Sequence, residues 1–386
     1  MKKTTFTFPT QIVFGNGAIQ TIPQELSKFQ IRKALIVTDK GLLQTGLVDT
    51  ITRQLKIAGV LYAIYDGVQG NPVEQDVYNG VKVYKDNVCD FVIGIGGGSP
   101  LDIAKLICLK STHDLPLEEY EDSKSGYEKI SSNLPSFMAI PTAAGTGSEV
   151  GRSAVVTLES SGRKTVIFSP HLLAKVVIAD PELTVRLPRE LTAATGMDAL
   201  THNLEAYLAK NFHPICDGIA LEGIKLVSNN LRRAVKEGTD LEARGNMLAA
   251  AMMGAIAFQK GLGVTHSLAH PLSTISGLHH GLANAIMLPH TMTFNSQVSV
   301  DRLADVALSL GVETTGLSPE ESTQAAINQV SILCQDIGIP TNLRQVGVLA
   351  EKIPVLAEQA IQDNCHQLNP RACTLQDMID IYSAAI

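Results

Sequence analysis

The protein has 386 residues, more than a single hydrophobic core usually serves, so we expect two domains. Apolar residues make up 45% of the chain and charged residues 18%, which is typical of a well-packed globular enzyme and excludes a disordered chain. The formal net charge is −7 and the lysines and arginines form no cluster, which argues against nucleic acid or an anionic membrane surface as a partner.

The cysteines and the first residues indicate a cytoplasmic location. Six cysteines are scattered without a C-x-x-C pair, as expected for free thiols in a reducing compartment. The basic start of the chain is followed by alternating polar and aromatic residues instead of the apolar stretch of a secretory signal. The longest apolar run, residues 247–258, is too short to span a bilayer and predicts a buried helix.

Short apolar runs alternate with amphipathic stretches in the first half of the chain. Helix-like segments at 46–59 and 71–87 separate several of the runs. This alternation predicts a mostly parallel sheet with helices on both faces, with residues 4–14 adding a strand or hairpin at one edge. The predicted strands are 33–38, 63–65, 91–94, 136–140 and 176–179.

After residue 180 the pattern becomes helical, with few strand signals. The predicted helices are 191–208, 215–235, 241–258, 264–273, 282–293, 300–310, 319–337 and 375–385. We therefore predict an α/β, Rossmann-like dinucleotide-binding domain at residues 1–185, followed by an all-helical metal-binding domain at residues 186–386.

A glycine-dense turn in FVIGIGGGSPLDIAK (91–105) follows a buried strand and precedes a helix. Gly96, Gly97 and Gly98 let backbone amides approach a phosphate, and the helix N-terminus adds positive partial charge. A tight turn without any ligand is an equal alternative, because the spacing is not the usual G-x-G-x-x-G.

Two further segments favour a nucleotide. In AIPTAAGTGSE (139–149), Thr142, Thr146 and Ser148 are placed to hydrogen-bond a nucleotide at the end of a neighbouring strand. Asp39 ends another strand, where a carboxylate accepts hydrogen bonds from a ribose 2′-hydroxyl and repels a 2′-phosphate, which favours NAD over NADP. Helix N-capping is an equally good interpretation of Asp39.

A carboxylate and several histidines indicate a metal site in the second half. Asp198 and His202 are four residues apart in a helical segment and so share one face. His266 and His270 repeat this spacing, and His280 follows. Such a set suits Fe²⁺, Zn²⁺, Co²⁺ or Ni²⁺ better than Ca²⁺ or Mg²⁺. The alternative is that these histidines are hydrogen-bonded core residues, although a shared metal would satisfy all of these buried polar groups at once.

These motifs resemble those of the iron-containing (group III) alcohol dehydrogenase family along essentially the whole chain. The matching pieces are GGGSPLDIAK, PTAAGTGSE, DPELT, TGMDALTHNLEAYL, GVTHSLAHPL, HGLANAIMLPH and NPRACTLQD. The resemblance implies NAD as the cofactor and one divalent metal, with Fe²⁺ the first choice. It also implies a small alcohol or aldehyde substrate and a homodimer or larger homo-oligomer.

The resemblance also assigns roles to individual residues. The implied metal ligands are Asp198, His202, His266 and His280, with His270 as a non-ligand histidine that either relays a proton or fixes its neighbour His266. The implied cofactor-binding positions are Asp39, Gly97, Gly98, Ser99, Asp102, Thr142, Ser148 and Lys164. Phe258 falls where a wall of the substrate pocket is expected.

Departures from the common family pattern suggest an acidic substrate. Arg152 and Lys260 stand near expected pocket positions, and HHG at 279–281 replaces the more usual PHG. Together with CHQLNP, which contains Cys365 and His366, these features resemble the 4-hydroxybutyrate dehydrogenase branch. We hypothesise that Lys260, Arg152 or His366 pairs with the carboxylate of 4-hydroxybutyrate or succinate semialdehyde. Each residue is equally explained as a surface charge or a structural ion pair.

Three alternatives remain open. The substrate is a neutral short alcohol or diol, such as 1,2- or 1,3-propanediol or lactaldehyde. The protein is a lyase of the dehydroquinate-synthase kind, although the phosphate-binding basic cluster that such a lyase needs is not apparent. It is a non-catalytic nucleotide-binding protein, although the complete ligand set argues against this.

Overall fold

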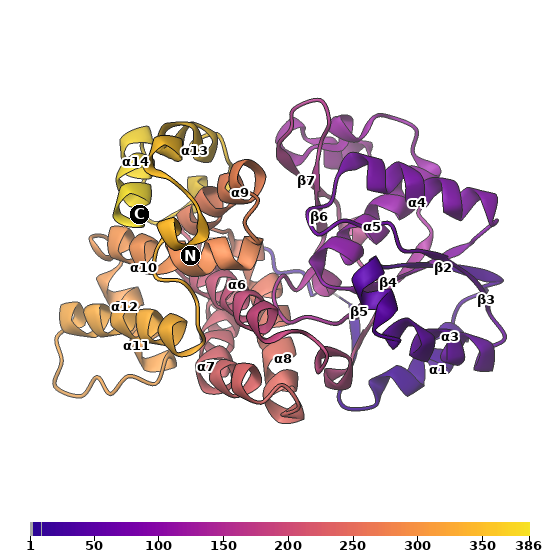
Figure 1. Ribbon diagram of the computed structural model, residues 1–386, viewed down its shortest axis with the longest axis horizontal. Helices are drawn as coiled ribbons and strands as arrows, with labels where there is room; N and C mark the ends of the chain where they lie inside the picture. Colours follow the sequence, from indigo (N-terminus) through magenta and orange to yellow (C-terminus); the bar gives the residue numbers. More distant parts are fainter. Residues whose placement is uncertain (1–2, 9) are drawn as a thin grey trace. The chain divides into compact units, whose positions relative to one another are not determined.

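The apolar runs of the first half form a parallel six-stranded sheet (Figure 1). The computed structural model describes residues 3–8 and 10–386. The strand order is β1-β8-β5-β4-β2-β3. The strands are β1 (Gln11–Phe14), β2 (Lys33–Val37), β3 (Leu61–Tyr65), β4 (Phe91–Gly96), β5 (Ser136–Pro141) and β8 (Val176–Ala179), which confirms the predicted parallel sheet.

Helices cover both faces of this sheet, which explains why its central strands are largely apolar and buried. On one face Phe91, Ile93 and Ile95 of β4 share a buried cluster with residues of α1 (Ile22–Leu26) and α3 (Leu47–Ile57). On the other face a Cβ added to Gly94 would lie 3.0 Å from the side chain of Ala104, on α5 (Gly98–Thr112). The remaining helices of this part are α2 (Lys40–Gln44) and α4 (Glu74–Asp86).

Of the strand or hairpin predicted at 4–14, the structure has a single edge strand, β1, which pairs in parallel with β8 and confirms the prediction; Pro9 lies outside the described residues. An antiparallel hairpin of β6 (Ser153–Thr157) and β7 (Lys164–Phe168) was not predicted. Its strands alternate buried and half-buried residues, as expected for a two-stranded ribbon with one covered face.

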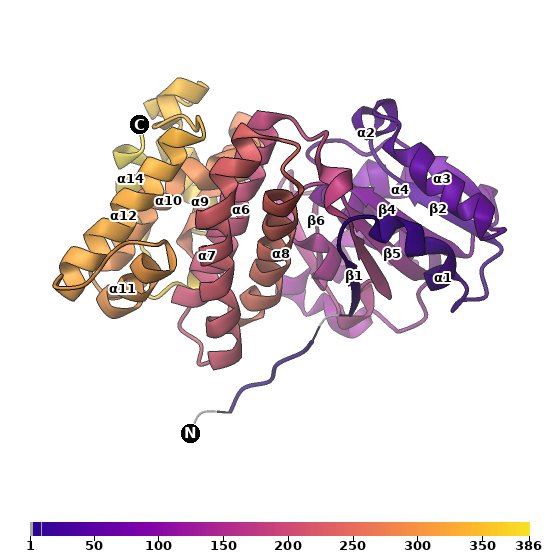
Figure 2. The same ribbon diagram turned by 90° about the horizontal axis from the view of Figure 1, so that it is seen from below.

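The second half is helical, as predicted, and Figure 2 shows α6, α7 and α8 side by side. The helices are α6 (Arg189–Leu208), α7 (Pro214–Lys236), α8 (Leu241–Ala257), α9 (Val264–Ser276), α10 (His280–Ser296), α11 (Val300–Ser309), α12 (Pro319–Asp336), α13 (Ile353–Ala360) and α14 (Leu375–Ala384). Only α13 was not foreseen. Among the described residues no single helix is long and apolar enough to cross a membrane; α8 and α9 pass that test together, with a bend of 112° between them.

Helix α6 is the centre of the helical region. Sixteen of its 20 residues are buried, so it is surrounded by other helices and carries polar side chains into the core. Its apolar residues belong to a cluster that runs through α7, α8, α9, α10 and the C-terminal helices.

The chain separates into two compact units close to the predicted boundary. One unit comprises Phe8–Ala143 and Ser148–Arg186 and contains the sheet; the other comprises Met1–Thr7, Ala144–Gly147 and Leu187–Ile386 and contains the helical bundle. Two short segments of the first half therefore belong with the helices. That residues 1–185 and 186–386 are the two domains stays a prediction.

We predict that Gly281→Ala destabilises the protein. A Cβ at Gly281, in the first turn of α10, would lie 2.3 Å from the carbonyl oxygen of Ala194 on α6, so the two helices must separate. We expect a loss of about 1–3 kcal/mol in the free energy of unfolding, measured by urea denaturation. Gly218→Ala is the matched control, because no atom from outside the backbone of its own helix lies within 4 Å of the added Cβ. Equal stability of the two variants would contradict the close approach.

Candidate metal centre and nucleotide-binding edge

The predicted metal ligands gather in the helical unit. Ligand atoms of Asp198, His202 and His266 all lie within 4.8 Å of one another, and all three residues are buried. The two Nε2 atoms of His202 and His266 are 3.0 Å apart. His280, at the start of α10, places its Nε2 3.5 Å from Oδ1 of Asp198. The structure therefore brings the four predicted ligands together from three helices.

This donor set fits a divalent cation. Burial lowers the pKa of His202 to about 4, so its imidazole is neutral at physiological pH, as a metal ligand must be. Two imidazole nitrogens face each other beside a buried carboxylate, an arrangement that a shared cation stabilises. A carboxylate with imidazoles suits a borderline transition metal.

Two residues that sequence reasoning missed contact the ligands. The buried Asn284 donates from Nδ2 to Oδ1 of Asp198 over 2.7 Å, and this nitrogen lies 3.2 Å from Nε2 of His280. Glu205 accepts a hydrogen bond of 2.6 Å from Nδ1 of His266. Helical spacing was the available signal, because Asn284 follows His280 by four residues and Glu205 follows Asp198 by seven.

His270 contacts His266 edge to face, with ring centroids 6.1 Å apart, but makes no hydrogen bond to it, so its role stays a prediction. Nδ1 of His270 lies 2.7 Å from Oδ2 of Asp363, and Nδ1 of His266 pairs with Glu205 instead. Burial alone would raise the pKa of Asp363, but His270 and hydrogen bonds from the Cys365 amide and the Ser267 hydroxyl hold it well below its usual range. Asp363 is therefore an ionised partner that orients the His270 ring, which lies 5.3 Å from that of His280.

Three predicted pocket residues also lie in this helical unit. The ring of Phe258, in the short 3-10 helix η8 (Phe258–Lys260), is 5.3 Å from that of His202. The Cys365 sulfur lies within 4.8 Å of a ring nitrogen of His270 and of a carboxylate oxygen of Asp363. Nδ1 of His366 is 3.4 Å from Oγ of Ser267, the residue after His266. Phe258, Cys365 and His366 therefore lie near the predicted metal ligands or next to His270.

Lys260 does not act as a substrate cation, contrary to the hypothesis. Its side chain is 1% exposed, and its Nζ donates to the carbonyl oxygen of Tyr207 over 2.7 Å and to Oδ1 of Asp217 over 2.5 Å. Arg302 pairs with the same Asp217 oxygen at 2.9 Å. The Lys260 ammonium therefore forms a buried structural ion pair with Asp217.

We predict that Lys260→Met lowers stability and leaves the binding of a carboxylate substrate unchanged. Removal of the ammonium leaves Asp217 with Arg302 alone, so the free energy of unfolding should fall by about 1–3 kcal/mol. Urea denaturation measures the loss. Lys225→Met, which breaks an exposed pair with Glu222, is the control and should cost less than about 1 kcal/mol. A wild-type unfolding curve for Lys260→Met would refute the structural role.

Predicted nucleotide-binding residues follow three neighbouring strands of the sheet unit. Asp39 follows β2, the turn of Gly96, Gly97 and Gly98 links β4 to α5, and Thr142 follows β5, so all lie at the carboxyl edge. The Thr142 amide donates to the Gly96 carbonyl over 2.9 Å and ties two of these turns together. Nucleotides bind at this edge of open parallel sheets.

The turn of Gly96, Gly97 and Gly98 has a backbone conformation and a close packing that require glycine at its first position. Gly96 has a φ of 148°, and a Cβ there would lie 2.6 Å from Cγ of Pro100. Gly97 is the N-cap residue of α5. Since glycine has no side chain, no N-cap side chain accepts a hydrogen bond from the first amides of the helix. Ser99 donates its hydroxyl to the Gly70 carbonyl. These features suit a phosphate at the helix start.

Other predicted cofactor residues have internal partners. Asp39 caps α2 by accepting a hydrogen bond of 2.8 Å from the Leu42 amide, so the capping interpretation holds and a ribose contact stays a prediction. The Ser148 hydroxyl donates to Asp102 over 2.5 Å and accepts from Lys105 over 2.8 Å. Direct contact of Asp102, Ser148, Thr146 or Lys164 with a cofactor likewise stays a prediction.

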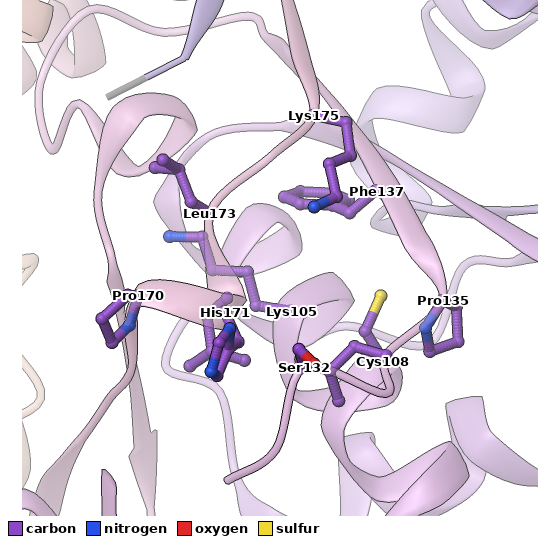
Figure 3. A pocket seen from close by; sticks show the side chains of 11 residues that line it. Lys105, Cys108, Ser132, Pro135, Phe137, Pro170, His171, Leu173 and Lys175 are labelled. Carbon is purple, nitrogen blue, oxygen red and sulfur yellow. The ribbon is translucent and has the colours of Figure 1, made fainter. Parts of the chain in front are cut away.

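A small cavity in the sheet unit is lined in part by Lys105, the partner of Ser148 (Figure 3). Its volume is about 80 Å³, too small for a dinucleotide. It is lined by Lys105, Cys108, Ser132, Leu134, Pro135, Phe137, Pro170, His171, Leu172, Leu173 and Lys175, none of which was a predicted site residue.

Comparison with known proteins agrees with these features. Residues 9–181 match the family described as "Iron-containing alcohol dehydrogenase", and residues 192–386 match "Fe-containing alcohol dehydrogenase family, C-terminal". The chain is 40% identical to the 1,3-propanediol dehydrogenase of Klebsiella pneumoniae, over 98% of this chain and 97% of that protein. It is 38% identical to the 4-hydroxybutyrate dehydrogenase of Cupriavidus necator, over 95% and 96% of the two chains.

A solved structure of similar sequence has the same fold. The crystal structure of a 1,3-propanediol oxidoreductase matches with a TM-score of 0.96 at 39% identity and covers 100% of both chains. The fold is that of an oxidoreductase family with an α/β region followed by a helical region. The chain belongs to the iron-containing alcohol dehydrogenase family, and this leaves the lyase and the non-catalytic alternatives without support.

Proposed function

We propose that the protein interconverts a small primary alcohol and its aldehyde, with NAD as hydride carrier and one divalent metal bound by Asp198, His202, His266 and His280. The observation that carries the proposal is the convergence of a buried carboxylate and buried imidazoles within one cluster of the helical unit. Membership of an alcohol dehydrogenase family supports the reaction class. Fe²⁺ is the first choice of metal, with Zn²⁺, Co²⁺ and Ni²⁺ as alternatives for the same donors.

We assign a separate role in the reaction to each group of site residues. When bound, the ion supplies Lewis acidity to the substrate oxygen. Oxidation removes a hydride from the carbinol carbon and a proton from the hydroxyl, and we assign the proton to His270, whose Nδ1 is held by Asp363. Phe258 supplies an apolar wall beside His202. The Gly96–Gly98 turn binds the cofactor phosphates, and Asp39 selects NAD over NADP.

For the substrate we propose 4-hydroxybutyrate and succinate semialdehyde, with Arg152 as the carboxylate partner. Its guanidinium is half-buried over the Phe168 ring, at 5.2 Å, and among residues 3–8 and 10–386 no carboxylate forms an ion pair with it. A neutral diol is the second candidate, because identities of 40% to a 1,3-propanediol dehydrogenase and 38% to a 4-hydroxybutyrate dehydrogenase favour neither. The cytoplasmic location and the homo-oligomeric state stay predictions.

Removal of the metal tests the reaction class. We expect chelator-treated protein to form no NADH from any of these alcohols and to recover when Fe²⁺ is added back, since the ion activates the substrate oxygen. Asp198→Ala should retain less than about 1% of wild-type kcat even with added Fe²⁺. NADH absorbance measures both. Full activity of the metal-free protein, or of Asp198→Ala, would refute the proposed centre.

Arg152→Met tests the substrate. If Arg152 binds the carboxylate, KM for 4-hydroxybutyrate should rise about tenfold or more, the value of one charge-assisted hydrogen bond. KM for 1,3-propanediol should not change, which controls for damage to the fold. Equal KM values for 4-hydroxybutyrate in the variant and the wild type would exclude Arg152, and a wild-type preference for the diol would favour the second candidate.

A further inference from the structure

Glu205 lies behind one of the proposed metal ligands. Its Oε2 is 2.6 Å from Nδ1 of His266, on the opposite side of the ring from Nε2. That Nε2 faces the cluster and is 3.0 Å from Nε2 of His202. Because a carboxylate only accepts hydrogen bonds, Nδ1 carries a hydrogen, and the neutral ring that a metal ligand requires then has its lone pair on Nε2, which faces the cluster.

The helix that carries His266 also holds the Glu205 carboxylate. Oε2 accepts from the Gly263 amide over 3.0 Å, and Oε1 accepts from the Thr265 amide over 2.6 Å. Both amides belong to the start of α9, where unpaired N–H groups favour an anion. Glu205 is buried, and among the described residues no lysine or arginine forms an ion pair with it.

We propose that Glu205 is a positioning residue for the metal centre. By fixing α9 and the His266 ring through three hydrogen bonds, it sets the tautomer and direction of Nε2 before an ion arrives. Carboxylates in this position raise the basicity of a ligating imidazole and its affinity for metal. The inference rests on the proposed metal site and adds a residue that does not itself touch the ion.

Helix α9 provides a matched control one turn further along. His270 pairs through Nδ1 with Asp363, which also accepts from the Ser267 hydroxyl and the Cys365 amide. This carboxylate–histidine pair has the same chemistry, but His270 is not a proposed ligand. Asp363→Asn should therefore leave metal affinity unchanged, whereas Glu205→Gln should not.

The test is titration of metal-free full-length protein with Co²⁺, followed by the visible absorption of the bound ion. Glu205→Gln keeps the size of the side chain but turns one oxygen into an N–H donor, which must face either the Thr265 amide or the Gly263 amide and His266. We expect Co²⁺ affinity to fall about 10- to 100-fold with an altered Co²⁺ spectrum. Circular dichroism of the metal-free variant checks the fold; if Glu205→Gln does not fold, Glu205→Asp replaces it.

The outcomes separate this inference from the proposed function. Unchanged Co²⁺ affinity and spectrum in the folded Glu205 variant, with tight binding by the wild type, would overturn the role of Glu205 alone. An equal loss of affinity in Asp363→Asn would also overturn it, because the effect would not be specific to the ligand histidine. Wild-type protein that binds Co²⁺ no better than Asp198→Ala would instead refute the metal site itself.

Discussion

The helical unit depends on the burial of polar side chains along one face of α6. Asp198, His202 and Glu205 are at most 5% exposed, and each would destabilise the fold if it lacked a partner. Their partners come from helices that are distant in the sequence: His266 with the first amides of α9, and Asn284 of α10. Satisfying this polar face therefore requires α9 and α10 to pack against α6, and the same packing makes the ligand cluster.

Close backbone approach makes this arrangement possible. Gly281 lets the first turn of α10 contact α6 beside Asp198, and Gly254 lets α8 contact α6 beside His202. In the sheet unit Gly96 and Gly94 serve the same purpose between β4 and α5. At these four positions a glycine allows a neighbouring element to approach a proposed site residue or the glycine turn.

The elements were predictable because they follow from short-range patterns, whereas the proposed set of four ligands came from the resemblance to a known family. Apolar runs predicted the strands, and four-residue spacing placed Asp198 beside His202. Pairs of residues that are far apart in the sequence were not predictable in this way. Lys260 and Asp217 are 43 residues apart, so the sequence alone did not distinguish a buried structural cation from a substrate-binding one. Helical spacing placed Glu205 on the face of Asp198, but its partner His266, 61 residues away, was not predictable from that spacing.

The most direct test of the account is anomalous X-ray diffraction from crystals of the Fe²⁺-loaded protein, recorded at the iron absorption edge. We predict a single strong peak per chain, bounded by Asp198, His202, His266 and His280, with Glu205 behind His266 and not in contact with the ion. Iron bound elsewhere in the chain, or a peak that lacks two or more of these four residues as neighbours, would contradict the proposed centre and the mechanism built on it.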